Sequence, residues 1–115
     1  MKLVIAFIQP FKVEKVLQAL HRVDGLSGAS FSQAKGFGRG RGPGAAARAA
    51  RHEELLGTSG RARVESVIPD RLEEEVVQAI RHAGHTGRSG DGKIYVVPVE
   101  RAVRIRNGEE GEAAV

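Results

Sequence analysis

The sequence contains no cysteine and no tryptophan, and aromatic residues make up only 4% of it. The lack of cysteine excludes disulfides, thiolate metal sites and cysteine catalysis. No apolar run approaches the roughly 18 residues that a membrane span needs. The run from Leu3 to Ile8 is too short for the hydrophobic region of a signal peptide, and Pro10 follows it at once. These absences lead us to expect a cytoplasmic protein.

The remaining composition describes a small basic chain with an aliphatic core. Apolar residues form 41% of the 115 residues, which suits one domain over residues 1–115. A domain of this size buries a limited share of its surface, so self-association would stabilise it. The formal charge of +4 is uneven, because arginines crowd residues 39–63 and glutamates crowd the tail, residues 107–115. A basic region attracts phosphate-bearing partners, although any one of these arginines could simply be solvated.

Hydrophobic periodicity places the elements of the first half. The run Leu3 to Ile8 predicts a buried strand, and a stripe of period 3.6 from Val13 to Val23 predicts a helix. Residues 28–35 form a weaker strand by position more than by propensity. Alternation from Arg61 to Ile68 predicts a half-buried strand that pairs with it.

A second helix follows. Asp70 opens it, the pattern runs to about Ala83, and Asp70 with Glu73 fits a capping box. His82 and His85 lie near its end. A metal site would need a third ligand that the sequence does not offer, so we expect no metal and favour a hydrogen-bonding helix terminus.

Two short strands are expected after this helix. Residues 94–97 predict a buried strand, and alternation over 102–106 predicts another. The second strand would place Arg104 and Arg106 on one face, where two guanidinium groups suit a grip on phosphate. Alternatively, these two arginines pair with the acidic tail just beyond them.

The long connector of residues 36–60 is rich in glycine and has no hydrophobic periodicity before Leu55. A connector of this length inside a compact domain indicates a function. We expect it to be disordered when free and ordered on a partner. The candidate partner-binding residues in it are Arg41, Arg48, Arg51 and His52.

The stretch Thr86 to Lys93 carries three glycines in six residues. It fits the spacing of a P-loop, but Ile94 stands where a magnesium-binding hydroxyl is required, and the loop runs from helix to strand rather than from strand to helix. We therefore reject a nucleotide hydrolase and predict a glycine-rich anion cradle. The alternative is a plain helix-to-strand connector.

The order strand, helix, strand, strand, helix, strand predicts an α+β fold, the ferredoxin-like βαββαβ arrangement with an antiparallel sheet. Both helices would cover one face of the sheet. The other face would stay open unless copies of the chain associate.

Four blocks in this order resemble the PII signal-transduction proteins along nearly the whole chain. They are Gln9-Pro10-Phe11-Lys12, Lys35 to Arg39, Thr86 to Lys93 and Arg104 to Glu110. The resemblance implies a homotrimer that binds ATP, ADP or AMP between subunits and is not an enzyme. It also implies control of a membrane transporter or metabolic enzyme, in nitrogen regulation, through the long loop between strands 2 and 3.

The resemblance also assigns nucleotide-binding residues by motif position. The phosphates would be held by Gly90, Asp91, Gly92 and Lys93, with Thr86 in the same loop and Arg104 and Arg106 reaching in from a neighbouring subunit. Gly36, Phe37, Gly38 and Arg39 would form the base of the long loop at the nucleotide. Ser30 and Val67 would contact the base.

The sequence departs from the family pattern in three places. Gly40 stands where a glutamine helps to bind magnesium and 2-oxoglutarate, and Arg61 replaces a lysine linked to 2-oxoglutarate. Both changes put magnesium and 2-oxoglutarate in doubt. The only tyrosine is Tyr95, in an expected strand, so we reject tyrosine nucleotidylation. The alternative function is a nucleic-acid-binding module that uses the arginine-rich loop. The scarcity of aromatics counts against it, because few side chains could stack on bases.

Overall fold

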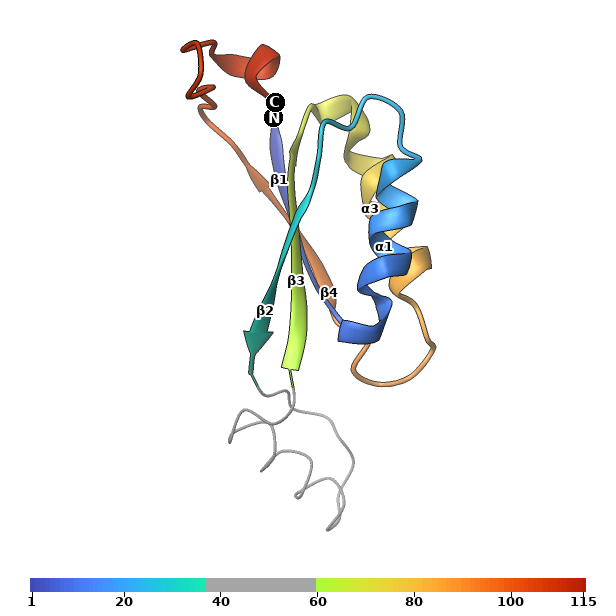
Figure 1. Ribbon diagram of the computed structural model, residues 1–115. Coiled ribbons are helices and arrows are strands. Elements are labelled where there is room, and N and C mark those ends of the chain that lie inside the picture. The colour runs from blue at the N-terminus through green and yellow to red at the C-terminus, as the bar shows by residue number, and fades with distance from the viewer. Residues whose placement is uncertain (37–59) are drawn as a thin grey trace.

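The computed structural model describes residues 1–36 and 60–115 (Figure 1). Its elements are β1 (Lys2–Ile8), a 3₁₀ turn (Pro10–Lys12), α1 (Val13–His21), β2 (Ser30–Lys35), β3 (Gly60–Ile68), a 3₁₀ turn (Asp70–Leu72), α3 (Glu73–Gly84), β4 (Lys93–Pro98) and a 3₁₀ turn (Gly111–Ala114). This order confirms the predicted βαββαβ fold. None of the helices in the described part of the chain has the length and apolar character that a membrane crossing requires.

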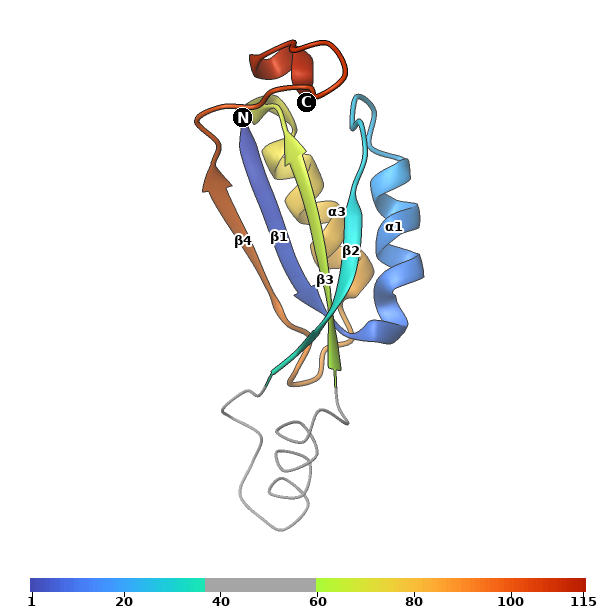
Figure 2. The ribbon, with the colours of Figure 1, turned by 60° about the vertical axis from the view of Figure 1, so that its left-hand side comes forward.

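The four strands form one antiparallel sheet in the order β2-β3-β1-β4. Both helices lie on the same side of this sheet, as the two ribbon views show (Figures 1 and 2). Leu3 on the central strand β1 pairs with Val67 of β3 and with Val97 of β4. The register therefore fixes which residues share an end of the sheet.

The core lies between the sheet and the helices, and its residues follow the predicted periods. Alternate residues of β3 are buried, as predicted, and so is the stripe of each helix. The buried apolar residues are Val4, Ala6, Ile8, Val16, Leu20, Val23, Ala62, Val64, Ile68, Leu72, Val76, Ile80 and Ala83. Burial of aliphatic side chains on this one face holds both helices to the sheet.

The opposite face of the sheet is open, as predicted. Tyr95 and Val97 of β4 are 49% and 43% exposed, and their partners on β1 are Ile5 and Leu3. The prediction of a buried strand at residues 94–97 is therefore wrong for the single chain. The physical reason is that β4 is an edge strand and that no second layer from residues 1–36 or 60–115 covers this face.

The strand predicted over residues 102–106 does not form. The backbone N–H of Arg104 donates to the carbonyl oxygen of Glu109, and the N–H of Gly108 donates to the carbonyl oxygen of Arg104, both at 2.8 Å. Gly108 adopts a φ of 73°, so the chain reverses there and only a bridge between Val103 and Glu110 remains. The acidic tail consequently folds back instead of extending a strand.

The predicted capping box at Asp70 is also wrong. The α-helix begins at Glu73, after a 3₁₀ turn, and no side chain caps either start. The carboxylate of Asp70 instead accepts a hydrogen bond from the amino group of Met1 at 2.8 Å. That hydrogen bond and the positive charge of the amine lower the pKa of Asp70.

Candidate ligand-binding site

The glycine loop connects α3 to β4 at the end of the sheet where β1 finishes. Its last residue, Lys93, is exposed and pairs with Phe7. The side-chain amide of Gln9 donates to the carbonyl oxygen of Gly90 at 2.7 Å. The segment after β1 therefore holds the middle of the glycine loop in place. Gln9 lies in the first of the four blocks that resemble PII proteins, where no role was predicted for it.

Asp91 determines the shape of this loop. Its carboxylate accepts hydrogen bonds from the backbone N–H of Thr86 at 2.8 Å, from the Thr86 hydroxyl and from the backbone N–H of Gly87 at 3.0 Å. The Thr86 hydroxyl and backbone, followed by the Gly87 backbone, hold the pKa of Asp91 below its ordinary value. The side chain of Asp91 therefore serves the loop itself, and a contact with phosphate would have to come from its backbone.

Two glycines in this loop are required by geometry. Gly90 and Gly92 adopt φ angles of 97° and 100°. A Cβ atom on Gly92 would lie 1.7 Å from the carbonyl oxygen of Phe7. No side chain fits there, because the loop backbone passes directly over the end of β1.

The base of the long connector lies beside the glycine loop. The Nη1 of Arg61 donates to the carbonyl oxygen of Gly60 at 3.0 Å. The Nη2 of Arg61 is 3.8 Å from the position that a Cβ on Gly90 would take. Gly36 is exposed after the end of β2, and Lys35 pairs with Gly60. A ligand at the glycine loop would therefore sit close to both ends of the connector.

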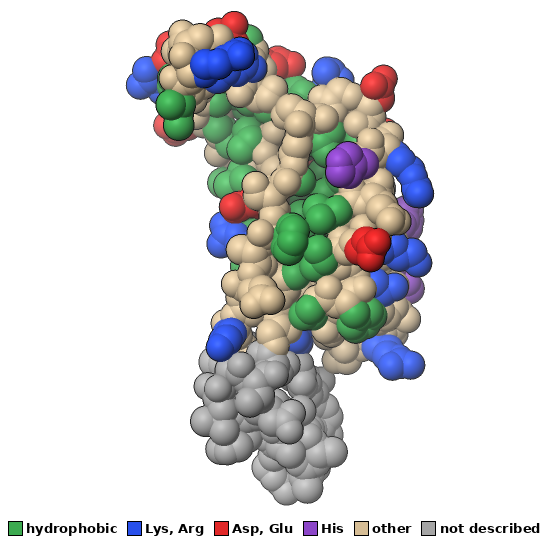
Figure 3. Space-filling view, in the orientation of Figure 1, with side chains coloured by type: hydrophobic (Ala, Val, Ile, Leu, Met, Phe, Trp, Pro, Cys, Tyr) green, Lys and Arg blue, Asp and Glu red, His purple; other side chains and the backbone are tan. Residues whose placement is uncertain are grey.

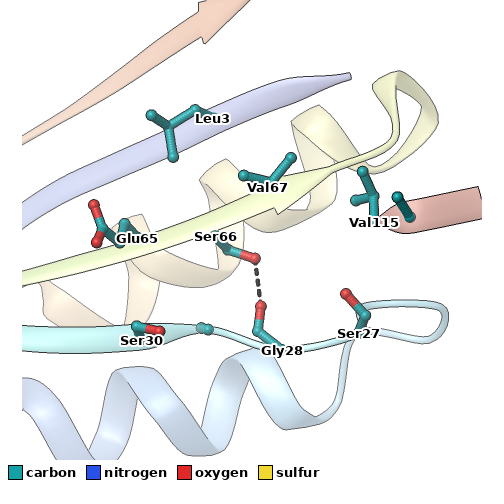
Figure 4. A pocket seen from close by; sticks show the side chains of 10 residues that line it. Leu3, Ser27, Gly28, Ser30, Glu65, Ser66, Val67 and Val115 are labelled. Carbon is teal, nitrogen blue, oxygen red and sulfur yellow. Dashed lines mark hydrogen bonds between the residues drawn. The ribbon is translucent and has the colours of Figure 1, made fainter. Parts of the chain in front are cut away.

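A second candidate region lies at the other end of the sheet. Ser30 and Val67, both predicted to contact a nucleotide base, line one open pocket of about 590 Å³ (Figure 4). The hydroxyl of Ser66 donates to the carbonyl oxygen of Gly28 at 2.5 Å. This hydrogen bond joins two residues of the pocket wall. No lysine, arginine or histidine is among the residues that line this pocket.

The C-terminal segment folds over this same end. Arg104 forms an ion pair with Glu109 and donates to the carbonyl oxygen of Ala113 at 2.7 Å. Arg101 pairs with Glu110, and Figure 3 shows basic and acidic side chains side by side at this end of the molecule. Arg106 is exposed. In the single chain, Arg104 is therefore paired with the acidic tail. This pairing was the predicted alternative to phosphate binding.

The structure separates the predicted site residues into two groups. Lys93 lies beside Phe7, whereas Val67 lies beside Leu3 at the opposite end of β1. Four residues of β-strand separate the two positions by about 13 Å. Phe37, Gly38, Arg39, Arg41, Arg48, Arg51 and His52 lie outside the described residues.

The part of the chain that the structure describes contains no group of three metal-ligating side chains. His82 and His85 are both exposed near the end of α3. For binding a ligand, the glycine loop offers backbone hydrogen-bond donors, and the pocket offers serine hydroxyls and apolar surface.

The fold and these two regions define a ferredoxin-like chain with a hydrogen-bonded glycine-rich loop at one end. At the other end is a pocket lined by serines, apolar residues and Glu65. The family model for nitrogen regulatory protein P-II matches residues 1–109. Proteins of that name from Azospirillum brasilense, Rhodospirillum rubrum and Haemophilus influenzae are 46%, 44% and 41% identical to this chain, over 100% of both chains in each case. The chain therefore belongs to the nitrogen regulatory protein P-II family. It is a signal-transduction regulator and not an enzyme.

Proposed function

We propose that this protein is a homotrimeric sensor of adenine nucleotides that acts in the cytoplasm. It would control a membrane transporter or a metabolic enzyme through residues 36–60. The observation that carries the proposal is the separation of the predicted ligand residues. Lys93 and the pocket at Ser30 and Val67 lie at opposite ends of one sheet. We place the nucleotide where the loop of one copy meets the pocket of the next, so that its phosphates and its base each contact one of the two regions.

The open face of the sheet supports the trimer. Exposed apolar side chains on β4 continue the half-buried row on β1, and the rings of Phe7 and Tyr95 meet edge to face at a centroid distance of 6.4 Å. A contiguous apolar face of this kind favours association. Cyclic association would cover the face in every copy and bring the two ends of neighbouring chains together.

The chemistry of each region suits a different part of a nucleotide. The glycine loop presents the Lys93 ammonium group and backbone that can approach a phosphate closely. The pocket has serine hydroxyls and apolar side chains and suits the uncharged base. A nucleotide would shift the states of the long connector by its differential affinity for them. The proximity of Arg61 to Gly90 gives a route for that effect.

Magnesium and 2-oxoglutarate are not part of this proposal. Gly40 lies outside the described residues, and glycine has no side chain that could bind these ligands. The nucleic-acid alternative depends on arginines 39–51, which also lie outside the described residues. No observation within residues 1–36 and 60–115 favours it over a nucleotide.

Isothermal titration calorimetry with ATP, ADP and AMP, each with and without magnesium and 2-oxoglutarate, tests the proposal. We expect dissociation constants on the order of micromolar for at least one nucleotide. Lys93→Ala should remove this binding, whereas Lys15→Ala on the exposed side of α1 should leave it unchanged. Folded wild-type protein that binds none of the three nucleotides would contradict the proposal.

A further inference from the structure

The last residues of the chain line the pocket that holds the predicted base contacts. The 3₁₀ turn Gly111–Ala114 folds back over the end of the sheet. Ala114 and Val115 then line the pocket together with Leu3, Ser30 and Val67. Figure 4 shows Val115 at one end of the pocket, next to Val67 and across from Ser27. Ala114 and Val115 are themselves partly buried.

Several contacts hold this segment in position. Arg104 donates to the carbonyl oxygen of Ala113 at 2.7 Å, directly before the two lining residues. The backbone N–H of Gly111 donates to the carbonyl oxygen of Ala102 at 3.0 Å. The N–H of Val115 donates to the carbonyl oxygen of Glu112 at 3.1 Å. The C-terminus is therefore a built part of this end of the molecule.

The chemistry of the pocket selects an uncharged planar group. Leu3, Val67 and Val115 provide apolar surface, and serine hydroxyls provide hydrogen-bonding groups. The charged side chain in the lining is Glu65, whose carboxylate accepts hydrogen bonds from Arg63 at 3.0 and 3.2 Å. The Glu65 carboxylate disfavours phosphate here, whereas a nucleobase has apolar faces and a polar edge.

We propose that Ala114 and Val115 form a wall of the nucleotide-base pocket, so that the C-terminus of the chain is part of the ligand site. This inference rests on the proposed function, because it concerns the base of the same nucleotide. The wall contributes apolar contact to the base and none to the phosphates. Its loss should weaken every ligand that carries the base by the same factor.

A truncated protein that ends at Ala113 tests the wall. Calorimetry would compare ATP, adenosine and inorganic tripolyphosphate on the truncated and wild-type proteins. We expect ATP and adenosine to bind about threefold to tenfold more weakly after truncation, since removal of an apolar side chain from a base has an effect of this size. Tripolyphosphate should bind both proteins equally.

Lys93→Ala supplies the opposite pattern, with tripolyphosphate and ATP weakened and adenosine unchanged. Glu112→Gln, at an exposed position of the same segment, is the matched control and should bind all three ligands like wild type. Unchanged ATP and adenosine affinities in the truncated protein, with wild-type ATP binding intact, would overturn the wall alone. Absence of ATP binding by the wild type would overturn the proposed function, and this inference with it.

Discussion

Asp91 holds Thr86 twice, because its carboxylate accepts a hydrogen bond from the Thr86 backbone N–H at 2.8 Å and another from the Thr86 hydroxyl. A third hydrogen bond comes from the backbone N–H of Gly87. The hydroxyl of Thr86 in turn accepts from the N–H of Arg88 at 3.1 Å. One carboxylate thus closes a six-residue turn from Thr86 to Asp91, and the glycine loop has a defined shape before any ligand arrives.

Asp91→Asn should weaken nucleotide binding without unfolding the protein. Asparagine has nearly the same size, but it carries no negative charge, and its amide nitrogen cannot accept the hydrogen bond that the Thr86 hydroxyl donates to the second carboxylate oxygen. We expect a loss of roughly tenfold in ATP affinity, measured by calorimetry, because charge-assisted hydrogen bonds preorganise the loop. Thr86→Ser keeps the hydroxyl and should bind like wild type. Equal affinities for Asp91→Asn and wild type would show that the turn does not need the carboxylate.

The lowered pKa of Asp91 predicts a pH dependence of stability. A carboxyl whose pKa is lower in the folded state stabilises the fold above its unfolded pKa of about 3.9 and loses that contribution as pH falls through the folded value. Wild type should therefore exceed Asp91→Asn in free energy of unfolding at pH 7, and the difference should vanish in strong acid. Urea titrations from pH 7 to pH 2 measure it, and a constant difference would contradict the assignment.

Gly92→Ala should destabilise the fold. The new Cβ would lie 1.7 Å from the carbonyl oxygen of Phe7, at a φ of 100° that alanine rarely adopts. We expect a loss of at least about 2 kcal/mol, from backbone strain and displacement of the end of β1. Gly28→Ala meets no atom within 4 Å and is the matched control. Thermal unfolding of both variants distinguishes a steric effect from a general effect of replacing glycine.

Tyr95→Asp should dissociate the proposed trimer. Tyr95 is 49% exposed on the open face, and a carboxylate there would be desolvated by a neighbouring copy. Phe11→Asp, at a residue that is 72% exposed away from this face, should leave the assembly intact. Sedimentation velocity gives the answer. A wild type that sediments as a monomer, or a Tyr95→Asp variant that remains trimeric, would exclude this face as the interface.

The sequence predicted the fold well because the core is periodic. Alternation in β3 placed Ala62, Val64 and Ile68 on the buried face, and the helical stripes identified Val16 and Val76. The resemblance to PII proteins drew attention to Gly90 and Gly92, two of the three glycines in the loop, and both adopt positive φ angles in the structure. These features depend on local patterns, which one chain displays in full.

The failures have two different causes. At Asp70 a partner distant in sequence replaced the expected local one, and at Arg104 a tight local turn replaced the expected strand. Asp70 was expected to cap its own helix. Its carboxylate instead accepts a hydrogen bond from the amino group of Met1, 69 residues away. Arg104 was expected on a strand, but the turn at Gly108 brings Glu109 and Ala113 to it. The C-terminal wall gave no sequence signal, because nothing in Ala114 indicates which pocket the chain end will reach.

Complementation between two inactive variants tests most directly that the nucleotide site forms between copies. Lys93→Ala damages the loop, and Arg104→Ala damages the opposite end, so each homotrimer should fail to bind ATP. A mixed trimer contains one boundary where an intact loop meets an intact Arg104. Trimers mixed in equal amounts should therefore regain about one quarter of the wild-type ATP sites in a calorimetric titration. Mixed trimers that bind no ATP, while the wild type does, would contradict a site shared between subunits.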